Sequence, residues 1–374
     1  MPITLFNITN FRNLSAVSLS AVSPGCNIIH GMNGSGKTSM LEAIHTLGLG
    51  RSFRSSATRE LIRQQTDKFT LFAQVLRNKT HHNTTIGIER TELGALRWRV
   101  DEKEVSAAAD VVSILPMRII NSHSHDLIEL GPNFRRKFLD WGLFYQFDDF
   151  LPCFKRFEMS LKQRNTLLRE KKFAKTCFDG LYERELDSWT EVLAKQAAEL
   201  TQFRRQYVKL LLPFLMNAIE MLSVIPQAQI KYDPGWDEDR SYATILADNA
   251  REDCQMGYTQ YGPHRADLEI LINAVPAKHF LSRGQQKLLV CAMVLAQGAL
   301  LSAERGNQVI YLVDDLPSEL DQISRQKLIA LLMAQQTQVF MTAIEKEMVD
   351  SHIQQTSTLP IKMFHVKHGE IVAK

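Results

Sequence analysis

Eight residues near the N-terminus, 31–38, have the types and spacing of a phosphate-binding loop. They read GMNGSGKT and fit the pattern GxxxxGK[ST]. Glycines let a backbone turn its N–H groups towards a phosphate, a lysine can reach the β- and γ-phosphates, and a threonine hydroxyl can bind Mg²⁺. We therefore predict an ATP and Mg²⁺ site that is formed by Gly31, Met32, Asn33, Gly34, Ser35, Gly36, Lys37 and Thr38.

Two adjacent carboxylates far along the chain have the setting of a metal site. Asp314 and Asp315 follow the apolar run VIYLV at 309–313, which is typical of a parallel strand buried on both faces. Ligands of α/β sheets bind at the carboxyl ends of such strands. We expect Asp314 to support Mg²⁺ and Asp315 to orient or deprotonate an attacking water. A solvated turn is the alternative, and the presence of a phosphate loop disfavours it.

A third polar stretch, FLSRGQQK at 280–287, precedes the apolar run LLVCAMVLA. Its Ser282 hydroxyl, the backbone around Gly284 and the start of a helix suit a phosphate group. On its own, the stretch is also explained by Ser282 as the N-cap of a buried helix.

The flanking residues predict the elements that position these groups. A strand at 26–30 leads into the loop, and apolar spacing over 39–47 predicts a helix after it. We expect a hairpin from ITLFNI and AVSLSAV, a strand at 337–344, and a closing hairpin in KMFHVKHGEIV that turns at His368-Gly369. The fold class is thus an α/β ATPase.

Composition narrows the class of protein. The chain has 374 residues, 45% of them apolar, and a net charge of only +3, so any nucleic-acid contact must come from a local patch. Five scattered cysteines indicate buried, reduced thiols in a cytoplasmic protein. The N-terminus lacks signal-peptide features, and no run of 18 apolar residues is present, so we expect no membrane association.

The order of these motifs resembles an ABC-type ATPase head. That resemblance implies that Ser282, Gly284 and Gln285 of one subunit cap the ATP held by a second subunit, and that Ser318 and Asp321 form the loop after the carboxylates. The chain would then form an ATP-dependent homodimer. Lys37 and Ser282 are 245 positions apart, which favours a short helical arm inserted into the head.

Further motifs resemble the bacterial RecF family of the ABC/SMC-type ATPases. They include NITNFRNL, GRSFR, GPNFRRKFLDWG, LKQRN and YTQYGPHRADLE, and they span nearly the whole chain. The resemblance implies a weak, DNA-stimulated ATPase of recombinational repair. It also implies binding to single-stranded, gapped or duplex DNA, and loading of RecA together with RecO and RecR.

Three positions depart from patterns of the class. The stretch from Asn121 to His125 lacks a clear glutamine, so we assign no sensor of Mg²⁺ and γ-phosphate there. Thr342 stands where transporters keep a switch histidine, and Asp315 replaces a longer glutamate, which suggests weak hydrolysis.

The middle of the chain predicts the arm. Steps of three and four from Leu186 to Leu210 form a short heptad seam, and 154–172 is also helical in period, with a break at 177–180. We expect a head at 1–112 and 257–374 and an arm at 113–256. The basic helix offers DNA contacts or only a solvated face; its candidates are Lys155, Arg156, Lys162 and Arg164.

Some assignments stay open on sequence alone. Arg12, Arg51 and Arg54 could contact ATP or DNA, or could be structural ion-pair partners; we take Arg12 forward as an ATP contact. An energy subunit of a membrane transporter and an architectural chromosome-binding ATPase are the alternative functions.

Overall fold

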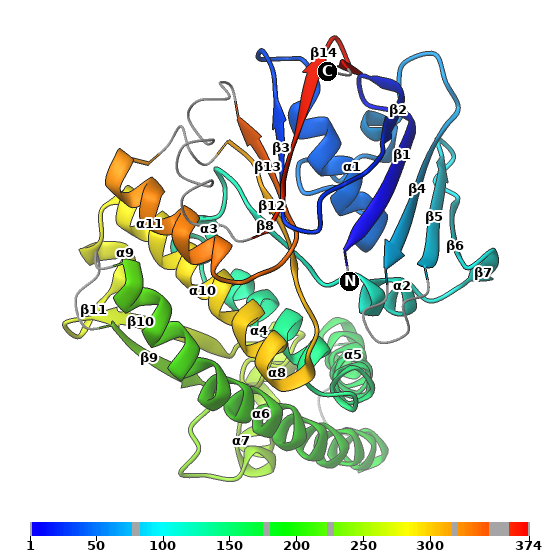
Figure 1. The fold of residues 1–374 in the computed structure, drawn as a ribbon. Helices are drawn as coiled ribbons and strands as arrows, with labels where there is room; N and C mark the ends of the chain where they lie inside the picture. The colour runs from blue at the N-terminus through cyan, green and yellow to red at the C-terminus, as the bar shows by residue number, and fades with distance from the viewer. Residues whose placement is uncertain are drawn as a thin grey trace. The chain divides into compact units, whose positions relative to one another are not determined.

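The computed structural model describes residues 2–76, 83–174, 180–222, 228–315, 320–343 and 359–372. The chain forms two compact units, and each is described by itself. Unit 1 contains residues 1–125, 217–224 and 283–374, and unit 2 contains residues 126–216 and 225–282. Figure 1 labels the elements of both units.

Unit 1 contains an antiparallel sheet in the order β2-β1-β4-β5-β6-β7. Its strands are β1 (Ile3–Phe11), β2 (Leu14–Leu19), β4 (Lys68–Leu76), β5 (Asn83–Thr91), β6 (Leu96–Val100) and β7 (Lys103–Val105). The predicted first hairpin is confirmed, since Phe6 pairs with Leu19 and Phe11 with Leu14. The strict alternation of buried and partly exposed residues along β4 shows that one face of this sheet is buried.

A second sheet of unit 1 is parallel and has the order β15-β14-β3-β13-β12-β8, with only β15 antiparallel to its neighbour. Its strands are β3 (Cys26–His30), β8 (Met117–Ile120), β12 (Ile310–Val313), β13 (Val339–Ala343), β14 (Ile361–Lys367) and β15 (Glu370–Val372). β12 and β13 are buried throughout, as the apolar runs predict. The closing hairpin turns at His368 and Gly369, which both have positive φ.

Helix α1 (Lys37–Leu49) lies between the two sheets of unit 1 (Figure 1). One buried cluster joins the inner face of the antiparallel sheet, α1 and the parallel sheet, through residues such as Phe6, Leu41 and Phe340. The other elements of this unit are η1 (Thr58–Leu61), α2 (Ala108–Ile114), α10 (Arg283–Arg305) and α11 (Gln322–Met333). Among the described residues, α10 alone is long and apolar enough to span a membrane, and 78% of its most apolar window is buried, as in a core helix.

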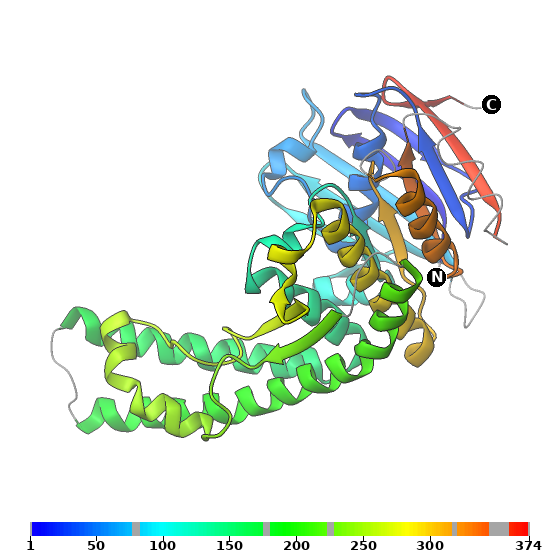
Figure 2. The ribbon, with the colours of Figure 1, turned by 90° about the vertical axis from the view of Figure 1, so that its left-hand side faces the viewer.

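Unit 2 is built on a long helical hairpin of α5 (Phe150–Ala174) and α6 (Gly180–Leu222), which run side by side (Figure 2). The last residues of α6, 217–222, belong to unit 1. The break predicted at 177–180 falls mostly outside the described residues. The unit also contains α3 (Asp126–Glu129), α4 (Pro132–Gln146), α7 (Tyr242–Asp248), α8 (Ala250–Met256) and α9 (Ala277–Phe280), and a small sheet of β9 (Ala228–Asp233), β10 (Asp267–Ile272) and β11 (Val275–Pro276).

The buried seam of α6 differs from the predicted one at every second position. Leu186, Leu193, Leu200 and Tyr207 are buried as expected. Their partners in the seam are Thr190, Ala197, Arg204 and Leu211, each one residue after the position predicted from hydrophobicity. The reason is that two of these positions carry polar side chains, which a search for apolar residues passes over.

The boundaries between the two compact units lie at other residues than the boundaries of the predicted domains, which are 1–112, 113–256 and 257–374. Strand β8 pairs in parallel with β12, which puts residues 117–120 in the ATPase sheet. Strand β10 pairs with β9, which puts residues 267–272 in unit 2. The division into head and arm as functional domains stays a prediction.

Four of the five cysteines, Cys26, Cys153, Cys254 and Cys291, are buried free thiols, as predicted. Cys177 lies outside the described residues.

Candidate nucleotide site

The predicted phosphate loop connects β3 to α1 in unit 1. The Lys37 ammonium folds back over the loop and donates hydrogen bonds to the carbonyl oxygens of Gly31 at 2.7 Å and Met32 at 3.1 Å. The Ser35 hydroxyl is buried and has no hydrogen-bond partner among the described residues. A buried hydroxyl without a partner and a helix N-terminus at Lys37 are groups that a phosphate would satisfy.

Two glycines of this loop are required by its geometry. Gly36 has a φ of 114°, and a Cβ there would come within 2.9 Å of Leu14 Cδ2. A Cβ on Gly31 would come within 2.3 Å of the carbonyl oxygen of Val366 on β14. The loop therefore fits tightly against the two terminal hairpins of unit 1, and any side chain at these positions would displace it.

Residues beyond the loop also fix its shape, and sequence reasoning missed them. Gly369 donates its backbone N–H to the Ser35 carbonyl at 2.8 Å, and Asn13 Nδ2 donates to the Gly34 carbonyl at 3.4 Å. Both residues lie in turns of the two hairpins. The signals in the sequence were the turn at His368-Gly369 and the Asn in NFRNL, and neither has a recognisable spacing to the loop.

Asp314 lies directly after β12 and accepts two side-chain hydrogen bonds. Thr38 Oγ1 donates to Asp314 Oδ1 at 3.0 Å, and Thr342 Oγ1 donates to the same oxygen at 2.9 Å. Burial raises the pKa of Asp314, and the bonds from Thr342 and Thr38 oppose this rise. The carboxylate predicted to support Mg²⁺ and the hydroxyl predicted to bind it are thus in direct contact.

Asp315 adopts a left-handed backbone conformation with a φ of 51°, which is uncommon for a residue other than glycine. Its N–H donates to Thr342 Oγ1 at 2.8 Å, so Thr342 bridges the two aspartates. Thr342 thereby has a structural role in place of the histidine found at this position in transporters. Burial lowers the pKa of Lys37, while Asp315 and Asp314 raise it.

Asn121 follows β8 at the same edge of the sheet. The register pairs Val313 with Ile120, and Asp314 donates its N–H to the Ile120 carbonyl at 2.9 Å. Asn121 is the residue that directly follows Ile120. Its side chain accepts a bond from the His123 N–H at 3.1 Å. Asn121 therefore lies beside Asp314 at the carboxyl edge of the sheet.

Arg12 forms a structural ion pair. Its Nη2 donates to Glu42 Oε1 at 2.6 Å and its Nε to Glu42 Oε2 at 3.0 Å. Glu42 is fully buried on α1, one turn after Thr38, and also receives bonds from Ser52 and from Arg54 at 3.5 Å. Of the two roles left open by the sequence, the geometry supports the ion pair for Arg12; its contact with ATP stays a prediction.

The predicted helix start at Ser282 is present, because α10 begins at Arg283. Ser282 and Gly284 are exposed, and Gln285 is partly buried. These residues can therefore meet a second subunit, and their role in capping its ATP stays a prediction. Of the two residues predicted to form the loop after the carboxylates, Ser318 lies outside the described residues. Asp321 is the N-cap of α11 and accepts bonds from the Ser324 N–H at 3.0 Å and hydroxyl at 2.6 Å, which lower the pKa of Asp321.

The candidate DNA contacts on α5 divide into two groups. Lys155 and Lys162 are exposed, and Arg156 is exposed but paired with Glu199 at 3.0 Å. Arg164 is a correction, because its side chain is fully buried and its guanidinium donates to Asp253 at 2.7 Å and to Thr259 at 2.7 Å. Its position in the helix points it into the core of unit 2, where it cannot contact DNA.

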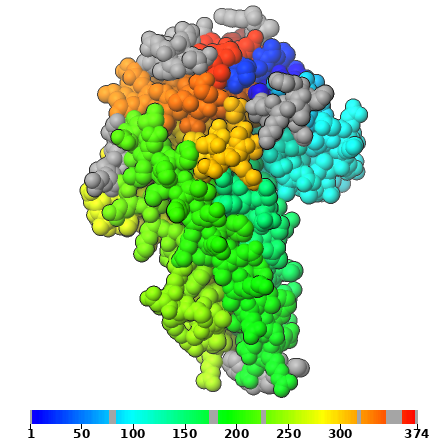
Figure 3. Space-filling view, turned by 60° about the horizontal axis from the view of Figure 1, so that its bottom comes forward, coloured from blue at the N-terminus to red at the C-terminus, as the bar shows by residue number. Residues whose placement is uncertain are grey.

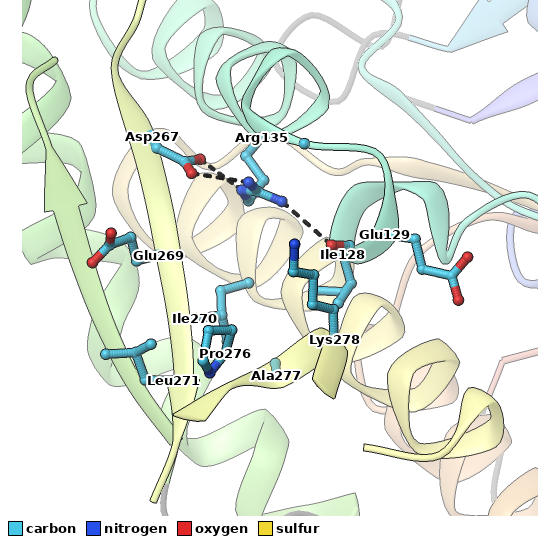
Figure 4. A pocket seen from close by; sticks show the side chains of 11 residues that line it. Ile128, Glu129, Arg135, Asp267, Glu269, Ile270, Leu271, Pro276, Ala277 and Lys278 are labelled. Carbon is cyan, nitrogen blue, oxygen red and sulfur yellow. Dashed lines mark hydrogen bonds and ion pairs between the residues drawn. The ribbon is translucent and has the colours of Figure 1, made fainter. Parts of the chain in front are cut away.

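Arg135 and Arg136 of the motif GPNFRRKFLDWG are also held by hydrogen bonds within unit 2. Arg135 makes a two-pronged bond to Asp267 at 2.6 and 2.9 Å and caps α3 through the carbonyl of Ile128 at 3.4 Å (Figure 4). It also donates to the carbonyl of Leu127 at 3.2 Å. Arg135 and Asp267 line a cavity of about 190 Å³, together with Lys278 and the apolar residues of β10 and β11. Because its guanidinium bonds both Asp267 and carbonyl groups of α3, Arg135 has a structural role.

Comparison with known proteins matches nearly the whole chain to one family. The RecF/RecN/SMC N terminal domain family matches residues 2–370. The chain is similar to the DNA replication and repair protein RecF of Pseudomonas syringae pv. syringae (strain B728a), with 42% identity covering 99% of this chain and 98% of that protein. It is 41% identical to the same protein of Pseudomonas aeruginosa (strain LESB58), with coverage of 99% and 97%.

Solved structures agree with these relatives. The recombination mediator protein RecF with ATP, from the RecFOR pathway, has a TM-score of 0.84 and 25% identity, covering 99% of this chain and 97% of that one. The Smc head bound to the C-winged helix domain of ScpA has a TM-score of 0.60 and 14% identity, covering 100% and 97%, and shows likeness of fold alone. The predicted fold class, an ABC-type ATPase head with an inserted helical arm, is therefore confirmed.

Proposed function

The chain belongs to the RecF family of DNA replication and repair proteins, and we propose that it is a cytoplasmic, weakly hydrolysing ATPase that binds DNA as an ATP-dependent homodimer. One observation carries the nucleotide part of this proposal. The Thr38 hydroxyl of the phosphate loop and the Asp314 carboxylate of β12 are 3.0 Å apart, and Thr342 joins the second aspartate to them.

The donor set suits Mg²⁺ bound with ATP. A threonine hydroxyl and a carboxylate are hard oxygen ligands, which Mg²⁺ prefers to nitrogen or sulfur. Thr38 and Asp314 would hold the cation, which would neutralise phosphate charge when bound. The buried Ser35 hydroxyl and the N–H groups at the start of α1 would bind the phosphates.

The chain's own residues would act as follows. Lys37 would exchange its two carbonyl partners for the β- and γ-phosphates, stronger acceptors because they are charged. Asp315, aimed by its left-handed backbone and its bond to Thr342, would orient the attacking water and accept its proton. Because an aspartate is shorter than a glutamate, this water would be held loosely, which fits slow hydrolysis.

The partners are proposed from the relatives. Their structures are named for the RecFOR pathway, so we propose that this chain acts with RecO and RecR to load RecA at single-strand gaps or junctions. Exposed Lys155 and Lys162 on α5 are its candidate DNA contacts in the arm. Ser282, Gly284 and Gln285 would cap the ATP of the second subunit.

Replacing Ser282 by a large cation tests the capping role. The Ser282→Arg chain should bind Mg·ATP as tightly as the unaltered chain and fail to dimerise, because an arginine cannot fit against a triphosphate held by the second subunit. Sedimentation velocity with a gapped duplex, with and without Mg·ATP, measures this. Ser302→Arg, at an exposed position near the other end of α10, is the matched control and should dimerise normally. Normal dimerisation of Ser282→Arg would exclude the capping role.

Asp315→Asn separates binding from hydrolysis. An amide accepts no proton, so ATP turnover should fall by about 10²–10⁴-fold, the usual contribution of a general base, while the ATP-bound dimer lives longer. Phosphate release in the presence of DNA and the dissociation rate of the dimer are the measurements. Unchanged turnover would remove Asp315 from the mechanism, and background turnover in the unaltered chain would favour an architectural protein in which ATP is structural.

A further inference from the structure

The loop that joins α8 to β10, residues 257–266, is held in place from several directions within unit 2. Thr259 donates its N–H to Asn165 Oδ1 of α5 at 2.7 Å, and Arg204 of α6 donates to the Pro263 carbonyl at 2.6 Å. The remaining bonds are Arg164 to Thr259 Oγ1 at 2.7 Å, Tyr242 to the Tyr261 carbonyl at 2.6 Å and Gln260 N–H to Asp253 Oδ1 at 3.1 Å. A loop held by several buried and partly buried bonds resists local opening and is rigid.

This rigid loop keeps large side chains in solvent. Tyr258 is 36% exposed, Tyr261 is 41% exposed, and Arg265 is also exposed. The Arg265 guanidinium lies over the ring of Tyr258, with 5.5 Å between its Cζ and the ring centroid. A loop with a fixed backbone that presents two aromatic rings and a stacked cation has the composition of a binding surface.

A hollow of about 370 Å³ opens beside Tyr258, and α5 forms its other wall. Its charged members, Arg169 and Lys172, are both cationic, and the remainder are Asn165, Met256, Gly257 and Tyr258. Gly257 allows the close approach, because a Cβ there would meet Lys172 Cδ at 3.2 Å and Arg169 Cγ at 3.3 Å. Lys172 bonds the Met256 carbonyl at 3.1 Å, which holds its ammonium at the rim of the hollow.

The C-terminal part of α5 carries this hollow. Helix α8 packs against α5 through Cys254 and Leu168 (Figure 2). The segment around α7 lies against α6 (Figure 3), where Arg205 pairs with Glu238. The hollow is therefore built from α5 and from residues about ninety positions later, which the arm's packing brings together.

We propose that this hollow binds one unpaired nucleotide of single-stranded DNA. The Tyr258 ring would stack on the base, as aromatic residues do in sequence-tolerant single-strand sites, and Arg169 and Lys172 would contact the neighbouring phosphates. A duplex keeps its bases stacked on one another and offers no free face to the ring. The proposal rests on the DNA binding proposed above and assigns part of it to the single strand.

The test measures fluorescence anisotropy of a short labelled oligothymidylate with the full chain. Tyr258→Ala should weaken binding about tenfold, since a stacked base contributes this order of affinity, while Tyr258→Phe keeps it because stacking needs no hydroxyl. Lys172→Gln should lower the slope of log affinity against log salt by about 0.7, the share of one phosphate of a single strand.

The matched control is Phe134→Ala. Phe134 is 37% exposed in the same unit and also has a cation over its ring, the Lys137 ammonium at 5.8 Å, so its removal should leave the affinity unchanged. Equal loss in Tyr258→Ala and Phe134→Ala, or an unlabelled duplex that competes as well as the single strand, would overturn the proposal. If the unaltered chain binds duplex but no single strand, only this inference fails; if it binds no DNA with Mg·ATP present, the proposed function fails first.

Discussion

The Lys37→Ala chain is expected to lose ATP affinity by at least about a hundredfold. Lys37 is nearly buried and its ammonium has two neutral carbonyl partners at 2.7 and 3.1 Å, which the charged β- and γ-phosphates would replace. Each hydrogen bond to a charged group contributes about 1.5–3 kcal/mol, so two of them account for a loss of this size. Titration with a fluorescent ATP analogue in the presence of Mg²⁺ measures it.

A second readout separates lost binding from lost folding. A ligand that binds only the folded chain raises its melting temperature, so Mg·ATP should stabilise the unaltered chain and leave Lys37→Ala unchanged. Lys68→Ala is the matched control, because Lys68 lies in the same unit in an exposed pair with Glu89, 2.7 Å apart. Stabilisation of Lys37→Ala by ATP to the usual extent would remove the lysine from the site.

The geometry of the candidate nucleotide site could be predicted because its parts depend on local sequence. The glycine spacing determines the loop, and the buried run before Asp314 determines the strand that ends at the carboxylates. Both motifs meet because parallel strands end at one edge of their sheet. The bond between Thr38 and Asp314 joins residues 276 positions apart, and it follows from two local predictions and one rule of topology.

The buried charge networks could not be predicted, because each needs a partner that no local pattern identifies. Glu42 lies in a helix predicted from its apolar spacing alone, yet it is fully buried and receives Arg12 from the first hairpin. Arg164 belongs to a basic stretch that resembles a DNA-contacting face, and its burial depends on Asp253, 89 positions away. The charge of a helical segment does not indicate which of its charged residues faces the core.

The motifs that carried the family resemblance contact one another in the structure. Arg164 and Asn165 of LKQRN bond Thr259 of YTQYGPHRADLE. Arg135 of GPNFRRKFLDWG bonds Asp267 of YTQYGPHRADLE. Asp140 of GPNFRRKFLDWG bonds Arg204 of α6. Several of these residues therefore hold the arm together and support the surface that the loop presents.

Arg164→Ala should lower the stability of unit 2 by about 3–5 kcal/mol. Removing one member of a fully buried ion pair leaves the other charge without compensation, and here Asp253 would remain buried at 1% exposure. The hydroxyls of Thr190 and Thr259 and the carbonyl of Leu246 would lose their donor as well. Denaturant unfolding followed by circular dichroism measures the change, and the helical signal of the arm should melt first.

Arg156→Ala, on the same helix, provides the contrast. Its pair with Glu199 is 47% and 40% exposed, so its loss should cost about 0–1 kcal/mol. If Arg164 instead contacted DNA directly, the Arg164→Ala chain would bind DNA poorly and keep its full stability. A double variant, Arg164→Met with Asp253→Leu, should recover much of the lost stability, because apolar side chains can replace a buried pair. If the double variant is as unstable as Arg164→Ala, the uncompensated carboxylate is not the cause, and the bonds to Thr259 must dominate.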